Sequence, residues 1–265
     1  MKYFILTDLE GTSGVYKWSQ VGGESANSEE YKLAKIWMTK EVNASIEGIL
    51  EKDKDAEIIV WDGHGPGGIE IEHLHPEAKL IPRGDIRCPY TLDQGYDAVI
   101  MIAQHSMAGT PKGNLCHTYS SRFIYRYWLN GREIGEIGLR AFVAGYFNIP
   151  VILVTGDDAT CKEAESFIPE VETVCVKKAI HHQLAITLHP EKARKLIKEG
   201  TKRAIEKIGK IKPIKINPPY VFKAQFLNST TTYHFTHSYS NIKKIDEYTI
   251  EIKGDDLLET VKIFA

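Results

Sequence analysis

Four side chains with metal-binding groups follow short apolar segments of this chain: Asp8, Glu10, His64 and His105. Asp8 and Glu10 are two residues apart, so their carboxylates project from the same face of an extended chain. His64 and His105 each follow a later apolar segment by two or three residues. Carboxylates combined with imidazoles suit zinc or a similar transition ion better than calcium. These residue types therefore indicate a metal centre.

Two further residues could join this group. Glu136 lies at the start of a predicted helix and could supply a third carboxylate, and His117 lies in a polar loop a dozen residues beyond His105. Taken alone, each has an ordinary explanation, because an aspartate such as Asp8 often caps backbone N–H groups and a first-turn glutamate favours a helix. Three crowded carboxylates, however, repel one another, and their pKa values must rise unless cations are present. Two divalent cations and one bridging hydroxide offset three carboxylates, so we predict a metal site.

Strands that end at one edge of a parallel sheet can bring these side chains together. Apolar runs alternate with helical patterns over the first two thirds of the chain, which is typical of βαβ units. The expected strands cover residues 3–7, 57–61, 98–103, 151–155 and 171–176. Ligands of such sheets collect outside the carboxyl ends of the strands, where the candidate residues lie. We therefore predict an α/β fold with a mostly parallel central sheet flanked by helices.

Local signals place helices and one hairpin. Asn27 begins a capping-box pattern that predicts a long helix. The pair Asn130-Gly131 between apolar flanks predicts a β-hairpin, and a helix over residues 136–147 should come after it. Thr160 can cap the next helix.

The pattern changes beyond about residue 185. A Lys/Glu-rich amphipathic helix, two strands and a closing helix are predicted over residues 190–209, 220–226, 248–253 and 255–264. We therefore divide the chain into an α/β metal-binding domain, residues 1–185, and a smaller α+β C-terminal domain, residues 186–265.

The composition argues against several classes of partner. Lysine plus arginine total 33 against 35 for aspartate plus glutamate, a formal net charge of −2, so the sequence has no basic excess for neutralising nucleic-acid phosphates. No apolar run approaches the ~18 residues of a membrane span, and the four apolar residues near the start are too few for a signal peptide. We expect no nucleic-acid or membrane partner and a cytoplasmic location.

The candidate residues lie in short motifs spread along the first 180 residues. The motifs are Thr7-Asp8-Leu9-Glu10-Gly11-Thr12-Ser13-Gly14, Asp62-Gly63-His64, Gln104-His105, Cys116-His117 and Gly135-Glu136-Ile137-Gly138-Leu139. In order and spacing they resemble the motifs of the zinc-dependent D-aminopeptidases of the DppA type. The segments 141–146 and 155–158 extend the likeness, and the remainder of the chain resembles the family only loosely.

This resemblance implies a dinuclear zinc site and its ligands: Asp8, Glu10, His64, His105 and Glu136. It implies that Asp8 bridges both ions and that His117 has a catalytic role. The implied activity is that of an aminopeptidase, which removes the N-terminal residue of short peptides, and peptides containing D-amino acids are the implied substrates. Family members assemble into ring-built decamers, so the resemblance also implies a homo-oligomer.

The residues suggest a mechanism, stated here as a hypothesis. A water held by two zinc ions would lose a proton, and the resulting hydroxide would attack the scissile carbonyl of a short peptide. His117 would carry a proton to the leaving amine, a task suited to a group that titrates near pH 6.5. Two alternatives stay open: a metal-dependent amidase or phosphoesterase that uses the same site, and a non-enzymatic binding protein stabilised by its ions.

Four other polar residues have less defined roles. Asp62 could orient the histidine two residues later or cap its loop, and we favour the cap. Cys116 adjoins the candidate catalytic histidine, but neighbours in an extended segment point to opposite faces, which argues against a Cys–His nucleophilic pair. His234 and His237 lie in an alternating pattern typical of a strand and would need a helix to bind a metal together.

Overall fold

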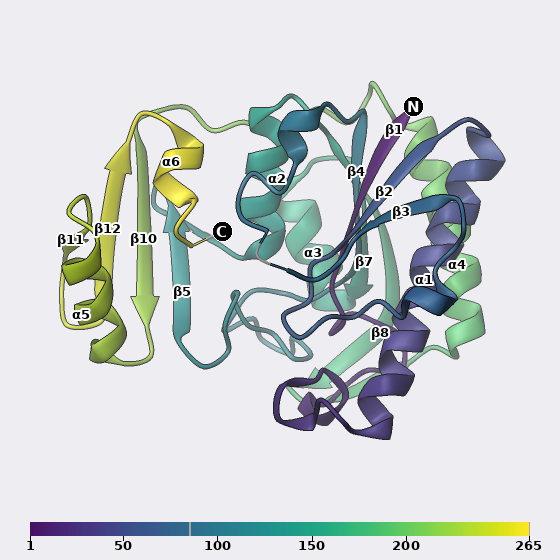
Figure 1. The fold of residues 1–265 in the computed structure, drawn as a ribbon, viewed down its shortest axis with the longest axis horizontal. Coiled ribbons are helices and arrows are strands. Elements are labelled where there is room, and N and C mark those ends of the chain that lie inside the picture. Colours follow the sequence, from purple (N-terminus) through teal and green to yellow (C-terminus); the bar gives the residue numbers. More distant parts are fainter. Residues whose placement is uncertain (85, 265) are drawn as a thin grey trace.

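A seven-stranded sheet forms the centre of the computed structural model, which describes residues 1–84 and 86–264. Its strands are β1 (Lys2–Thr7), β2 (Glu57–Asp62), β3 (Ala78–Ile81), β4 (Ala98–Gln104), β7 (Val151–Asp157), β8 (Glu172–His181) and β9 (Leu184–Thr187). They lie in the order β3-β2-β1-β4-β7-β8-β9 (Figure 1). Neighbouring strands from β3 to β8 are parallel, and β9 is antiparallel to β8. The predicted mostly parallel sheet is confirmed.

Helices cover both faces of this sheet: α1 (Glu29–Lys52), α2 (Glu136–Tyr146), α3 (Asp158–Phe167) and α4 (Pro190–Glu206). On one face α1 packs against α4, and on the other α2 and α3 contact each other (Figure 1). Strands β4 and β7 are buried along their whole length. Because both faces are covered, the interior strands are continuous apolar runs rather than alternating ones.

Two helices begin with side-chain caps that differ from the predicted ones. Ser28 caps α1, accepting the Tyr31 N–H at 3.1 Å, one residue after the expected Asn27. Asp157 caps α3 and accepts the Thr160 N–H at 2.7 Å, so Thr160 lies inside the helix. The expected cap at Thr160 is therefore wrong, because Asp157 at the end of β7 already meets the first unpaired N–H groups.

A second, antiparallel sheet lies beside the first, with the strand order β11-β12-β10-β5-β6 (Figure 1). Its strands are β5 (Ile124–Leu129), β6 (Arg132–Ile134), β10 (Tyr220–Phe226), β11 (Lys243–Lys244) and β12 (Thr249–Gly254). The predicted hairpin is confirmed: Asn130 and Gly131 join β5 to β6, with positive φ angles of 49° and 80°. Two short helices, α5 (Ser229–Ser238) and α6 (Leu257–Val261), pack on this sheet.

The segment around His234 and His237 is part of α5, so the strand expected there is wrong. Asn228 caps this helix, and Phe235 stacks on Phe226 of β10 with ring centroids 5.3 Å apart. Thr232 is buried and Phe235 half-buried on the helix face that meets the sheet, which the alternating pattern did not reveal. His237 lies exposed on this helix, its Nδ1 2.8 Å from the carbonyl oxygen of Tyr233.

Each sheet contains elements from both the N-terminal and the C-terminal part of the chain, or packs against them. Strands β5 and β6, residues 124–134, belong to the second sheet, while α4 packs on the first. The division into domains near residue 185 stays a prediction. Among residues 1–84 and 86–264, no helix is both long and apolar enough to cross a membrane.

The candidate site lies where the strand order of the central sheet reverses direction. From β1 the chain continues to β2 and β3 on one side, and from β4 it continues to β7 and β8 on the other. Connections therefore diverge between β1 and β4, which opens a crevice at their carboxyl ends. Gly11 fits here because its N–H donates to Ala103 O at 2.8 Å and a Cβ would lie 2.0 Å from Gln104 O. The segment after β1 therefore lies directly against the end of β4.

Candidate metal centre

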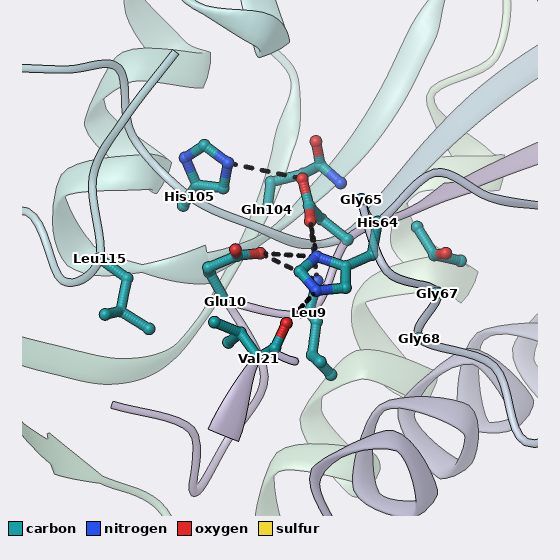
Figure 2. Close-up of polar contacts among 12 residues, drawn as sticks. Leu9, Glu10, Val21, His64, Gly65, Gly67, Gly68, Gln104, His105 and Leu115 are labelled. Carbon is teal, nitrogen blue, oxygen red and sulfur yellow. Dashed lines mark hydrogen bonds and ion pairs between the residues drawn. The ribbon is translucent and has the colours of Figure 1, made fainter. Parts of the chain in front are cut away.

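The ends of β1 and β2 bring together three side chains that we call the first half of the centre: Asp8, Glu10 and His64. Their ligand atoms lie within 4.8 Å of one another, and all three side chains are buried. His64 Nδ1 lies 3.0 Å from Asp8 Oδ1 and 3.2 Å from Glu10 Oε2 (Figure 2). The parallel register pairs Thr7 with Asp62, so the residues directly after both strands emerge at the same height.

Three other side chains form what we call the second half: His105, His117 and Glu136. Their ligand atoms also lie within 4.8 Å of one another. His105 follows β4, and its Nε2 lies 3.3 Å from Oε1 of Glu136, the first residue of α2. His117 belongs to the loop before β5, and its ring stacks on that of His105 with centroids 3.9 Å apart. The second half therefore combines three separate segments of the chain.

Asp8 joins the two halves. Its Oδ1 faces His64, while its Oδ2 lies 3.5 Å from His105 Nε2. The two oxygens of one carboxylate thus point toward different halves, which is the arrangement needed to bridge two ions. All five predicted ligands and the predicted catalytic histidine meet at this edge of the sheet.

Both ligand-type imidazoles are oriented by backbone carbonyl groups. His64 Nε2 lies 2.8 Å from Val21 O, and His105 Nδ1 lies 3.1 Å from Ser106 O (Figure 2 shows the Val21 contact). An N–H at each of these positions donates to the carbonyl and turns the opposite ring nitrogen toward the carboxylates. Metal-binding histidines are commonly oriented in this way. The donor set therefore fits a divalent transition ion.

A guanidinium group completes the second half. Arg140 is one turn beyond Glu136 in α2; its Nη2 lies 2.9 Å from Glu136 Oε2, and its Nη1 lies 3.8 Å from Asp8 Oδ2. Burial opposes ionisation of Glu136, but the charges of Arg140 and His105 outweigh it and lower the pKa of this carboxyl to about 2. Burial also opposes charge on His105, yet Glu136 and Asp8 raise its pKa to about 10.

Arg140 reaches the first half only through the shared Asp8, and the described contacts place no guanidinium beside Glu10 or His64. Its own carboxylates hold the pKa of His64 well above the ordinary value despite burial. His64 in turn holds the pKa of Glu10 well below its ordinary value. The pKa values of Glu10 and Glu136 therefore do not rise, because imidazoles and Arg140 supply the positive charge that crowded carboxylates require. In the metal-free protein two imidazolium groups and one guanidinium offset three carboxylates.

Two residues of the site were missed by the sequence analysis. Arg140 could have been found, because a glutamate and an arginine four residues apart face each other on a helix. Lys177 gave no signal: it is buried on β8, and its Nζ donates to the carbonyl oxygens of Glu10 and Val15. Burial lowers the pKa of Lys177 to about 8. Its contacts hold the segment after β1 that begins at Glu10.

His117 differs from the other two imidazoles. Its Nδ1 lies 2.9 Å from Leu115 O, so an N–H there leaves Nε2 as the available nitrogen. Burial and the charge of the stacked His105 lower the pKa of His117. The ring of Trp18 meets it edge-on, with centroids 5.5 Å apart. His117 is therefore a neutral imidazole near pH 7 that can accept a proton at Nε2.

The remaining candidates have structural contacts. Asp62 accepts the N–H groups of Gly68 and Ile69 at 2.9 and 3.1 Å, which confirms the loop cap. The Cys116 thiol lies 3.7 Å from Nδ1 of His182, and burial raises its pKa. A thiol whose pKa is raised stays protonated at neutral pH, so Cys116 is not suited to act as a thiolate nucleophile.

A cavity of about 600 Å³ opens above the centre. Its lining includes Asp8, Glu10, His64, His117, Glu136 and Arg140, and also aromatic and charged residues from surrounding loops. A volume of this size lies within the range of about 300–1,000 Å³ that is usual for small-molecule sites.

The fold and the site together have the layout of a metal-dependent hydrolase on a doubly wound α/β sheet. The Peptidase_M55 family model, described as D-aminopeptidase, matches residues 1–265. A D-aminopeptidase of Bacillus subtilis (strain 168) is 32% identical over 264 residues, covering 98% of this chain and 93% of that protein. The solved structure of the Zn-dependent D-aminopeptidase DppA from Bacillus subtilis, described as a self-compartmentalizing protease, matches with a TM-score of 0.90 and 30% identity. That match covers 98% of this chain and 94% of the solved one.

The chain therefore belongs to the D-aminopeptidase family. Membership confirms the resemblance inferred from the motifs and the predicted class of enzyme, an aminopeptidase.

Proposed function

We propose that this protein is a zinc-dependent aminopeptidase that removes the N-terminal residue, preferably a D-residue, from short peptides. The observation that carries this proposal is the meeting of two ligand clusters, joined by the contact of Asp8 with His105, at the floor of one cavity. The solved relative is described as Zn-dependent, and the donor set here suits that ion.

Two ions would be held by residues already facing each other. The first half would bind one ion through Asp8, Glu10 and His64, and the second would bind the other through Asp8, His105 and Glu136. Bound zinc supplies Lewis acidity, which polarises a carbonyl oxygen and lowers the pKa of water toward neutrality. The chain's own groups do the remaining work.

The floor of the cavity offers partners for a free amino terminus. The α-amino group of a substrate would bind a metal ion as a neutral amine or donate a hydrogen bond to Glu10 or Glu136, which line the cavity. Binding of this group next to the centre would position the first peptide bond for cleavage, which explains removal of the terminal residue.

His117 is placed to move the proton that the reaction requires. Its neutral ring, held through Nδ1 by Leu115 O, presents Nε2 for proton transfer. A group of this kind takes a proton as the attack begins and delivers it to the leaving amine as the bond breaks.

Chelation and an activity panel test the proposal. We expect the zinc-loaded protein to hydrolyse D-alanine p-nitroanilide faster than the L-isomer, to lose activity in chelator, and to regain it with two equivalents of zinc. Cleavage of p-nitrophenyl phosphate instead of both anilides would support a phosphoesterase. Cleavage of none of the three by a protein holding two ions would support a binding protein.

We also propose a homo-oligomer, more specifically a ring-built decamer, in the cytoplasm. The solved relative is described as a self-compartmentalizing protease. Large apolar side chains are exposed around the second sheet, including Phe123 at 53%, Leu227 at 50% and Tyr233 at 63%. Exposed apolar groups gathered in one region favour contact with another protein surface. Light scattering of the purified chain tests the oligomer; a monomer at micromolar concentration would contradict it.

A further inference from the structure

The cavity above the metal centre has a second charged region at its rim. Carboxylates lie at the floor, while the loops around the mouth contribute the arginines Arg83 and Arg122. Both arginines are exposed and come from different parts of the fold. Arg83 follows β3 in the first sheet, and Arg122 lies just before β5 of the second sheet.

Arg83 is fixed beside the first half of the centre. Its Nε donates to the carbonyl oxygen of Gly65, which directly follows His64 (Figure 2 labels both residues), and its Nη1 donates to Gly84 O at 3.2 Å. The guanidinium is thus attached to the backbone one residue from a candidate ligand. Carbonyl partners are neutral, so these contacts orient the positive charge without cancelling it.

Arg122 belongs to the loop that contacts the second half. The Tyr119 N–H donates to Glu136 Oε1 at 2.7 Å, and Arg122 is three residues further along the chain. Three residues extend at most about 11 Å, which is also the length of an extended tripeptide. A short peptide whose amino end lies at the carboxylates can therefore reach the rim with its carboxyl end.

The contact of Arg122 with Glu24 does not prevent this. Arg122 Nη2 lies 2.7 Å from Glu24 Oε1, but the two side chains are 65% and 86% exposed. Ion pairs between exposed side chains contribute little stability, so a substrate carboxylate can displace Glu24. Arg140, in contrast, is buried against the ligand carboxylates and belongs to the centre itself.

We propose that Arg83 and Arg122 form a subsite for the free α-carboxylate of short peptide substrates. This inference rests on the proposed aminopeptidase function and adds a substrate class: unblocked peptides of two or three residues. The cavity then receives the amino end of a peptide at the metal centre and its carboxylate at a positively charged rim. Arginine suits this role because its planar group donates two parallel hydrogen bonds to a carboxylate.

A matched pair of substrates tests the subsite: D-leucyl-glycyl-glycine and its C-terminal amide. Hydrogen bonds to charged groups correspond to about 10- to 100-fold in affinity, so the free acid should have a kcat/KM higher by about that factor. Arg122→Gln and Arg83→Gln should each raise KM for the free acid about tenfold, with little change in kcat and no change for the amide.

Two further variants make the result specific. Glu24→Gln should lower KM for the free acid, because it removes the carboxylate that competes for Arg122. Arg132→Gln, an exposed arginine on β6 that does not line the cavity, should change neither substrate.

The outcomes separate this inference from the proposed function. Equal cleavage of acid and amide by the unaltered protein would overturn the subsite and leave the aminopeptidase intact. An equal loss for both substrates in the arginine variants would also overturn it. Cleavage of neither peptide by the zinc-loaded protein would overturn both proposals.

Discussion

The two halves of the centre solve the same electrostatic problem differently. The first half, Asp8, Glu10 and His64, comes from adjacent parallel strands and contains two carboxylates facing one imidazole. The second half adds Glu136 from a helix that begins after a hairpin of the other sheet, and Arg140 lies 2.9 Å from that carboxylate. The permanent charge of Arg140 pairs directly with Glu136 and approaches the first half only through the shared Asp8, at 3.8 Å.

This difference has a consequence for metal binding. A guanidinium beside the ligands repels an incoming dication, whereas a proton can leave. We therefore expect the first half to bind its ion more tightly than the second. The shared carboxylate of Asp8 should make occupation of the two halves interdependent.

Asp8→Ala should have the largest effect, because Asp8 faces both halves. We expect loss of both ions and a fall in kcat/KM of more than about 10³-fold, since several kcal/mol of Lewis-acid stabilisation disappear. Metal content by elemental analysis and activity at saturating zinc measure this.

Glu10→Gln and Glu136→Gln are the matched controls for Asp8→Ala, because each carboxylate faces one half. Each should reduce binding mainly in its own half. An Asp8→Ala protein that still holds two ions would contradict the bridging arrangement.

His117→Ala should reduce kcat by about 10²–10⁴-fold, the usual contribution of a positioned acid–base group. Metal content should stay unchanged, because the proposed ligands of the second ion are Asp8, His105 and Glu136. The acidic limb of the pH–rate profile should disappear as well, since activity falls when His117 becomes protonated. His181→Ala, an exposed histidine, is the control. If His117→Ala empties the second half, His117 is a ligand and the two halves are more alike than proposed.

Arg140→Met tests the difference between the halves directly. Removing the guanidinium should tighten zinc binding in the second half by about 10- to 100-fold. The metal-free protein should lose about 3–5 kcal/mol of unfolding free energy, because a buried Glu136 carboxylate loses its partner. Zinc titration against a competing chelator and urea unfolding in chelator measure the two effects. Unchanged zinc affinity in the second half would contradict the expectation that the first half binds its ion more tightly than the second.

The pH dependence of zinc affinity should show a smaller, graded effect. The pKa values of His64 and His105 are raised in the metal-free protein, the latter to about 10, so both rings are protonated at neutral pH. Each ion must displace one proton, so affinity per ion should rise about tenfold per pH unit and fall as pH falls. For the second half this rise should end near pH 10. Calorimetric titration in buffers of different ionisation enthalpy counts the protons released; a count of zero would contradict the proposed charge balance.

Much of the site could be predicted because its residues lie directly after strands. Neighbouring parallel strands end at one edge of the sheet, so Asp8, Glu10, His64 and His105 could be grouped from local pattern alone. The pairing of Arg140 with Glu136 could have been found from their spacing, but the approach of Arg140 to Asp8 depends on how α2 packs against the sheet. The aromatic spacing around Phe235 was ambiguous for a similar reason: a burial partner, Phe226, distinguishes the helix from a strand.

The amino-acid sequence by itself determined five of the seven strands of the central sheet (β3 and β9 were not predicted), the hairpin at Asn130-Gly131, and which side chains are able to bind a metal. These depend on short-range preferences and on hydrophobic periodicity, which act within a few residues. Only the tertiary structure decided that one aspartate faces two clusters, that Lys177 holds the segment after β1, and that arginines line the cavity mouth. Those arrangements depend on the relative placement of elements far apart in the chain, which long-range packing sets.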